Sequence, residues 1–107
     1  MKIEIKPLSV NDCWQGRRFK TRDYKIYEQE LLYLLPKIEI PKGKLHLKLR
    51  VGYSNKLSDI DNCLKPFVDI LQKKYGFNDN KIYKLEIEKV DVKKGDEFID
   101  FHIWQSV

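Results

Sequence analysis

The sequence predicts an α+β fold, in which a mixed β-sheet carries two packed helices in the order β-α-β-α-β-β. Apolar residues fill every second position from Leu45 to Val51, which is the period of a half-buried strand. Two other stretches repeat apolar residues at intervals of three and four, which is the period of a helix with one buried face. The length of 107 residues predicts a single domain spanning residues 1–107.

The first half of the chain is expected to place one helix between two strands. Residues 2–6 alternate apolar and polar side chains and predict a short strand, and residues 7–20 predict a long loop. A stripe of tyrosines and leucines with helical spacing begins at Thr21 and ends at Pro36. The strand with the regular alternation follows and covers residues 45–53.

The second half is expected to contain one helix and two strands. Pro66 belongs in the first turn of the helix, which places the regular start near Asn62, and Gly76 follows the helix end. Residues 82–92 and 98–104 predict two strands. The intervening Lys-Lys-Gly-Asp sequence predicts a hairpin turn between these strands.

Composition and charge narrow the classes of function. The net charge is +5, and residues 1–58 carry 13 basic against 6 acidic side chains, whereas residues 59–107 carry 8 against 10. This asymmetry is typical of a protein that binds a polyanion, although a well-solvated lysine-rich surface gives the same balance. The apolar runs are too short for a transmembrane helix and the first residues lack the apolar core of a signal peptide. Cys13 and Cys63 match neither a zinc spacing nor a disulfide framework, so we expect a cytoplasmic protein without membrane attachment.

Three aspartates around the second helix are candidate metal ligands. Asp59 and Asp61 lie at the expected helix start, and Asp79 follows the turn after the helix. Asp79 returns to the other two if strand 82–92 runs back along strand 45–53. Converging carboxylates repel one another and attract a divalent cation, and such oxygen ligands suit Mg²⁺ or Mn²⁺. The alternative is that the first two aspartates cap the helix and that Asp79 is an ordinary turn residue.

Several neighbouring residues have two possible roles. Lys65, one turn into the helix, is either a phosphate partner or a solvated helix lysine. Asn62 either fixes a carboxylate ligand or caps the helix. Trp14 either stacks on an unpaired base or folds back onto the core. His46 and His102 lie on strands without a ligand spacing, and we expect both to be structural.

The order and spacing of these residues resemble a known family. Asp-Ile-Asp-Asn-Cys-Leu-Lys at 59–65, a helix, and then Gly-Phe-Asn-Asp at 76–79 resemble the RusA family of Holliday junction resolvases. Pro-Leu-Ser-Val-Asn at 7–11, before a basic stretch, is similar to the N-terminal segment of that family. The resemblance covers residues 6–92. The sequence departs from the family pattern in having one lysine at 54–58 in place of several arginines, and Asn-Asp-Asn in place of the commoner Asp-Asp pair.

The resemblance implies a RusA-like fold and a Mg²⁺-dependent endodeoxyribonuclease. Such an enzyme resolves four-way Holliday junctions by paired symmetric nicks during recombination and repair. The resemblance places Asp59, Asp61 and Asp79 at the positions of the metal-binding catalytic aspartates and Lys65 at that of the catalytic lysine. It also implies a homodimer, because two equivalent sites are needed to nick two strands symmetrically.

DNA binding by such a protein requires cations around the acidic site. The candidate DNA-binding residues are Asn11, Arg17, Arg18, Lys20 and Lys56. Three other functions remain open: a nuclease for other branched DNA such as flaps, a non-catalytic DNA-binding module of the same fold, and a protein-interaction domain whose charge is incidental. A steep salt dependence of DNA affinity separates the last of these from the others.

Overall fold

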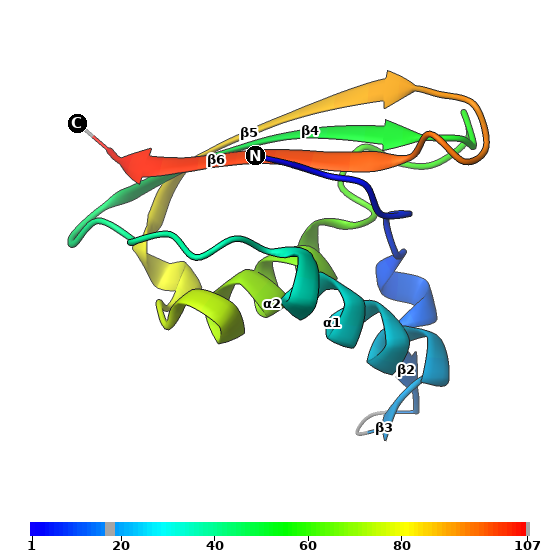
Figure 1. The fold of residues 1–107 in the computed structure, drawn as a ribbon, viewed down its shortest axis with the longest axis horizontal. Coiled ribbons are helices and arrows are strands. Elements are labelled where there is room, and N and C mark those ends of the chain that lie inside the picture. Colours follow the sequence, from blue (N-terminus) through cyan, green and yellow to red (C-terminus); the bar gives the residue numbers. More distant parts are fainter. Residues whose placement is uncertain (17–18, 107) are drawn as a thin grey trace.

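The computed structural model describes residues 1–16 and 19–106 of the chain. It confirms the expected α+β class: a four-stranded mixed sheet has the order β1-β6-β4-β5, and both helices cover one of its faces (Figure 1). A small hairpin of β2 and β3 stands apart from this sheet. In chain order the elements are β1 (Lys2–Ile3), the 3₁₀ turn η1 (Val10–Asp12), β2 (Trp14–Gln15), β3 (Phe19–Lys20), α1 (Arg22–Leu34), β4 (Leu45–Tyr53), α2 (Leu64–Tyr75), the 3₁₀ turn η2 (Asp79–Lys81), β5 (Ile82–Asp91) and β6 (Phe98–Gln105).

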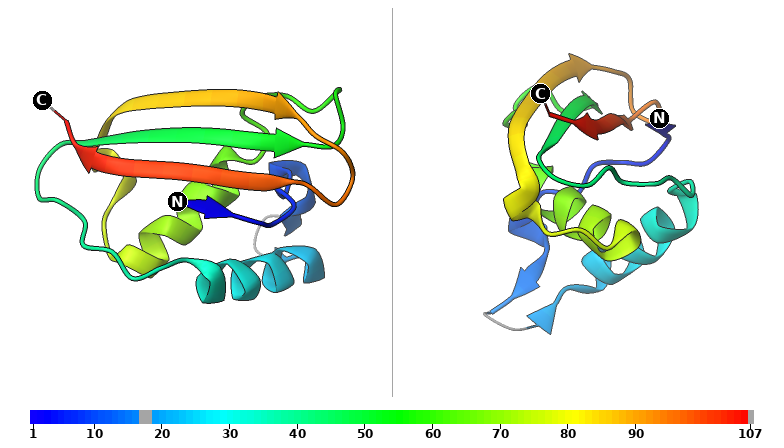
Figure 2. Two further views of the ribbon diagram at one scale, coloured as in Figure 1. Left: turned by 45° about the horizontal axis from the view of Figure 1, so that its top comes forward. Right: turned by 90° about the vertical axis from the view of Figure 1, so that its left-hand side faces the viewer.

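Strand β4 lies between β5 and β6 (Figure 2). β5 runs parallel to β4, with Leu45 opposite Ile82 and Tyr53 opposite Asp91, whereas β6 runs antiparallel to it. The unit β4-α2-β5 is therefore a crossover connection, which parallel strands require. This arrangement pairs strand 82–92 with strand 45–53 in parallel, so Asp79, just before Ile82, lies at the Leu45 end of β4, whereas Asp59 and Asp61 follow its Tyr53 end.

The expected hairpin between β5 and β6 is wrong, because these strands pair with opposite edges of β4. The predicted turn itself forms, since the Asp96 amide donates to the Lys93 carbonyl at 2.9 Å. Just before this turn the chain passes the end of β4, where the Val92 amide donates to the Tyr53 carbonyl at 2.9 Å. β4 is buried along most of its length, so both of its edges need strand partners to satisfy its backbone groups.

The two helices form close to the expected bounds. Thr21 caps α1, because its hydroxyl accepts a hydrogen bond from the Tyr24 amide at 3.1 Å. α2 begins at Leu64, two residues later than expected, and contains Pro66 in its first turn. Gly76 ends α2 in the left-handed conformation, with φ of 70°. Because α2 begins late, the residues at 59–63 form turns rather than helix.

The core lies between the sheet and the helices. Phe67 of α2 and Phe101 of β6 are fully buried and meet edge to face, with ring centroids 5.6 Å apart. Glu28 of α1 joins the two helices through an ion pair with Lys73 of α2, at 2.9 Å. Among the described residues, no helix is long and apolar enough to cross a membrane.

The N-terminal region differs from the expected strand and loop. β1 is shorter than the strand expected at 2–6 and pairs only with β6. The expected loop at 7–20 contains η1 and the β2–β3 hairpin. Within this region η1 lies against α2.

Candidate functional site

Three of the predicted site residues line one hollow beside α2. Asp61, Lys65 and Asp79 share a space of about 480 Å³, which we call the carboxylate hollow. Its walls are otherwise apolar and are formed by Val10, Leu64, Val68, Ile82, Tyr83 and Leu85. The fold thus brings Asp79 from the start of β5 to the same surface as residues from the start of α2.

A line of hydrogen bonds along α2 holds Asp79 in this position. The Lys65 ammonium donates to Asp69 Oδ1 at 2.9 Å, one turn further along the helix. Gln72 donates to the same carboxylate oxygen at 3.4 Å. The Gln72 side-chain carbonyl accepts a hydrogen bond from the Asp79 backbone amide at 2.8 Å. Asp69 and Gln72 are therefore supporting residues that the sequence analysis missed, although their spacing from Lys65 on one helix face was visible.

Lys65 is a cation at physiological pH. Its hydrogen bond to Asp69 raises its pKa above the ordinary value, and the negative charges of Asp69 and Asp79 raise it further. Its side chain is 65% exposed, so the ammonium group is accessible to a ligand in the hollow. This geometry fits a phosphate partner and does not fit a proton acceptor.

The alternative capping role of Asp59 and Asp61 is not what the structure shows, whereas Asp79 does lie in a turn, η2. Cys63 is the N-cap of α2 and makes no side-chain cap bond. At η2 the cap is Asn78, whose side chain accepts from the Asn80 amide at 3.0 Å. Within residues 1–16 and 19–106, the side chains of the three aspartates make no hydrogen bond or ion pair, and all three are exposed. Their carboxylates are therefore not used for local structure.

Asp59 departs from the expected convergence of three carboxylates. Asp61 and Asp79 line the carboxylate hollow, whereas Asp59 lies outside its lining, two residues earlier in the turn. In the described part of the chain, no three His, Cys, Asp or Glu side chains are grouped closely enough to hold a metal ion together. Two carboxylates nevertheless suit Mg²⁺, which keeps several water ligands and is often bound by only one or two carboxylates and a substrate phosphate. The donor set therefore fits Mg²⁺ and does not form a closed protein cage.

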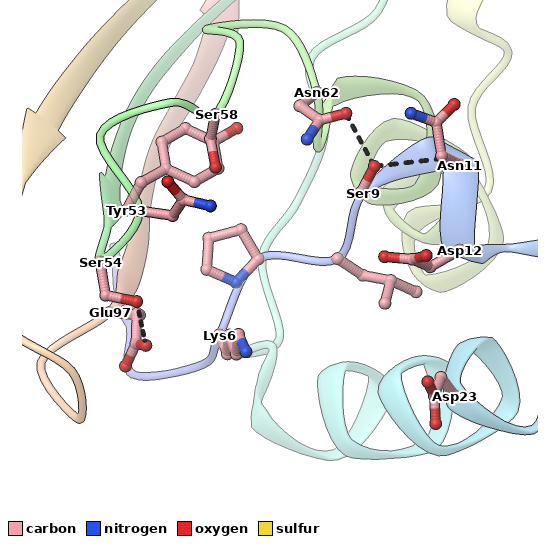
Figure 3. Close-up of a pocket in the computed structure, with 13 residues that line it drawn as sticks. Lys6, Ser9, Asn11, Asp12, Asp23, Tyr53, Ser54, Ser58, Asn62 and Glu97 are labelled. Atoms are coloured by element: carbon pink, nitrogen blue, oxygen red, sulfur yellow. Dashed lines mark hydrogen bonds between the residues drawn. The ribbon is translucent and has the colours of Figure 1, made fainter.

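Asn62 joins the first loop to the start of α2 (Figure 3). The Ser9 hydroxyl donates to Asn62 Oδ1 at 2.8 Å, and the Val10 amide donates to the Asn62 carbonyl at 2.9 Å. The Asn11 amide donates to the Ser9 hydroxyl at 3.2 Å, which caps η1. We call the contacts of Ser9 and Val10 with Asn62 the clasp. The clasp connects two segments that are 53 residues apart in the sequence and places Val10 in the wall of the carboxylate hollow.

A second hollow lies on the other side of the clasp. It has a volume of about 600 Å³ and its lining is mainly polar: Lys6, Pro7, Leu8, Ser9, Asn11, Asp12, Asp23, Tyr53, Ser54, Asn55, Ser58, Asn62 and Glu97 (Figure 3). Its hydroxyl and carboxyl groups partly satisfy one another, since Ser54 donates to Glu97 at 2.7 Å. Three carboxylates against one lysine make this hollow a poor site for a phosphate.

Lys89 is another supporting residue that the sequence analysis missed. Its ammonium donates to the Lys56 carbonyl at 2.8 Å and also to the Ser58 carbonyl. These bonds hold the turn that leads into Asp59 against β5. The signal in the sequence was a lysine at the position that follows Leu85 and Ile87 in the alternation of apolar residues along this strand.

The predicted DNA-binding residues come from separate elements. Arg17 and Arg18 lie outside the described residues. Lys20 pairs with Glu28 at 2.9 Å and is 33% exposed, so part of its charge is used within the fold. Asn11 and Lys56 are exposed, the former on η1 and the latter in the turn after β4.

The remaining polar candidates have structural roles. His46 is buried and its Nε2 lies 2.8 Å from Glu86 Oε2, across the β4–β5 pair. His102 is exposed on β6, and its Nε2 lies 3.7 Å from Asp100 Oδ1. Cys13 and Cys63 are buried, and burial raises the pKa of both thiols, which keeps them protonated and unreactive at neutral pH.

Comparison with known proteins adds no assignment. No protein-family model matches the chain, and no curated protein matches it either. The family resemblance therefore depends on the motifs given above, and the function is argued from the residues themselves.

Proposed function

We propose that the protein is a Mg²⁺-dependent endodeoxyribonuclease that cleaves branched DNA, with the four-way junction as its main substrate. One observation carries this proposal: the fold gathers two uncommitted carboxylates and a lysine cation, from segments distant in sequence, on one accessible hollow. The order of the motifs, which resembles the RusA family, supplies the substrate class.

The aspartates are the proposed metal ligands. Asp61 and Asp79 would hold the ion in the carboxylate hollow, and Asp59 is the proposed third carboxylate from the adjoining turn. When bound, Mg²⁺, or Mn²⁺ in its place, lowers the pKa of bound water and neutralises charge on a scissile phosphate. Gln72 and Lys89 hold the two turns that carry these carboxylates, at Asp79 and at Asp59 respectively.

Lys65 is the proposed electrostatic partner of the phosphate. Its bond to Asp69 restrains the ammonium on the rim of the hollow and keeps it protonated. A fixed positive charge at this position stabilises the negative charge that develops as the phosphodiester bond breaks. Asn62 positions this constellation, because the clasp fixes the turn between Asp61 and the first residue of α2.

The substrate would be held mainly by cations. Arg17, Arg18, Lys20 and Lys56, with Asn11, remain the proposed contacts to phosphate and sugar groups. Each phosphate contact by a lysine or arginine releases counterions, so the affinity for DNA is expected to fall steeply with salt. The protein and DNA charges are complementary, since the first 58 residues have an excess of seven positive charges.

A second copy of the chain is the proposed protein partner. β5 is an edge strand of ten residues that pairs only with β4. Tyr83 and Leu85 on this strand are 65% and 42% exposed beside the carboxylate hollow. Light scattering is expected to give twice the monomer mass of 12.9 kDa, and Leu85→Lys is expected to shift the protein to the monomer. A monomeric wild-type protein at assay concentration would remove the homodimer from the proposal.

A substrate panel tests the proposed activity. Labelled four-way junction, flap and linear duplex are incubated with the protein, with Mg²⁺ or with EDTA. We expect paired symmetric nicks in the junction, only with Mg²⁺. Preferential cleavage of the flap would reassign the substrate, and salt-sensitive binding without cleavage would indicate a DNA-binding module. Absence of DNA binding at low salt would refute the nucleic-acid function altogether.

A further inference from the structure

The hairpin of β2 and β3 presents two aromatic side chains to solvent. Trp14 is 43% exposed and Phe19 is 73% exposed. With Gln15, Lys20 and Lys25 they line a shallow hollow of about 610 Å³. The hairpin lies beside the N-terminal end of α1 and away from the sheet (Figure 1). Two exposed aromatic rings that line one hollow with two lysines form a candidate binding surface.

The body of the protein holds Trp14, whereas Phe19 is opposite Gln15 and lies on the other face of the hairpin. The Trp14 ring meets the buried Tyr24 ring edge to face, with centroids 5.7 Å apart. The Thr21 amide donates to the Cys13 carbonyl at 2.9 Å and closes the base of the hairpin. Lys20, opposite Trp14 in the hairpin, is fixed by Glu28 at 2.9 Å. Trp14 therefore keeps an exposed face while its other edge is anchored.

The surroundings of the pair favour a nucleic acid as its partner. Two lysines, Lys20 and Lys25, flank the rings, and none of the described residues that line this hollow is acidic. Flat aromatic faces next to ammonium groups match unstacked bases that are flanked by phosphates.

The hairpin also lies within reach of the carboxylate hollow. Val10 lines that hollow and is held by the clasp to Asn62. Trp14 follows Val10 by four residues, a chain length that spans at most about 14 Å.

We propose that Trp14 and Phe19 form a stacking platform, with one ring on each face of the hairpin, for unpaired bases at the branch point of the DNA. The inference rests on the proposed function and adds how branched DNA is distinguished from linear duplex: only a branch offers unstacked bases. The platform contributes little to the binding of linear duplex, whose bases are already stacked. It would also bind single-stranded DNA, whose bases are free to stack on the rings.

Tryptophan fluorescence tests this proposal without cleavage. In the Trp104→Phe variant, Trp14 is the only tryptophan, and EDTA is present throughout. We expect single-stranded DNA and the four-way junction to quench Trp14 emission, and linear duplex to leave it nearly unchanged. In parallel, Phe19→Ala is expected to weaken binding of the junction and of single strands by about ten-fold, and of duplex by less than about two-fold. Tyr33→Ala is the matched control, because Tyr33 is 87% exposed elsewhere on α1.

The outcomes separate the platform from the proposed function. Quenching by single strands but no preference for the junction would support the platform and refute the junction substrate. DNA binding without Trp14 quenching, and with equal affinities for Phe19→Ala and Tyr33→Ala, would overturn the platform and leave the nuclease proposal intact. No quenching by any DNA, together with no binding, would refute both. Circular dichroism checks that each variant is folded.

Discussion

The Ser9 hydroxyl links the first loop to the start of α2, and its removal is a quantitative test of that link. Ser9→Ala deletes a donor to Asn62 Oδ1 at 2.8 Å and an acceptor for the Asn11 amide at 3.2 Å. The first bond is partly buried and the second is exposed, so we assign about 1 kcal/mol to the first and about 0.5 kcal/mol to the second. The expected loss of unfolding free energy is therefore about 1–2 kcal/mol.

Urea denaturation measures this loss, with Ser9→Thr as the control that keeps the hydroxyl group. In a domain of this size the same loss lowers Tm by about 5–10 °C. A double-mutant cycle with Asn62→Ala isolates the side-chain bond, and its coupling energy is expected to be about 1 kcal/mol. The clasp also contains a backbone hydrogen bond, in which the Val10 amide donates to the carbonyl of residue 62. None of these substitutions removes either backbone group, so this bond remains in every variant.

A Ser9→Ala variant as stable as wild type, or a coupling energy of zero between Ser9 and Asn62, would refute the stabilising role of the clasp. The same variant also has an expected functional effect. Because Val10 lines the carboxylate hollow next to Asp61, loosening the clasp should slow junction cleavage more than it weakens junction binding. An unchanged cleavage rate in a measurably destabilised variant would show that the clasp supports the fold alone.

Three further predictions concern the fold and the lysine of the site. Burial raises the pKa of Glu28, but its hydrogen bonds to two lysines outweigh this and leave the pKa below its ordinary value of 4.5. Its ion pairs therefore stabilise the fold above that pH. In urea titrations at pH 7, Glu28→Gln should lower the free energy of unfolding by about 1 kcal/mol, and this loss should vanish as the pH falls through the lowered pKa. A loss that is independent of pH would contradict this. In Gly52→Ala the new Cβ would lie 2.5 Å from the Phe98 ring, so we expect thermal unfolding to show a loss of about 1–3 kcal/mol in unfolding free energy. Adding Phe98→Leu to the same chain should reduce this loss. If the losses of the two single variants simply add in the double variant, the clash is refuted. Lys65→Met should lower the cleavage rate about 100-fold or more in single-turnover assays with little change in junction affinity, whereas Lys74→Met on the same helix should cleave normally; equal effects would remove the specific role of Lys65.

Local patterns predicted the helices and the central strand well. Alternation at Leu45–Val51 identified β4, and the Thr21 cap and Gly76 fixed one end of each helix, because these signals act over a few residues. The pairing of β5 and β6 was predicted wrongly for the same reason. A Lys-Lys-Gly-Asp turn favours a hairpin locally, but the buried β4 requires a neighbour on both edges, which is a property of the whole sheet.

The candidate site was predictable only in part. The motif spacing placed Asp61 and Lys65 together at the start of α2, and Asp79 lines the same hollow from the turn before β5. The supports of the site were not predictable in the same way. Gln72 and Lys89 act by bonding backbone groups of distant turns, and such contacts leave no periodic pattern in the sequence.

Junction cleavage by single aspartate variants tests the central claim most directly. Asp61→Asn and Asp79→Asn remove one carboxylate each from the hollow with almost no change in shape, and Asp91→Asn is the control on an exposed carboxylate at the opposite end of β5. With labelled four-way junction and Mg²⁺, we expect both hollow variants to bind the junction and to lose cleavage, while Asp91→Asn nicks it as wild type does. Wild-type cleavage rates in Asp61→Asn and Asp79→Asn would contradict the assignment of the carboxylate hollow as the active site.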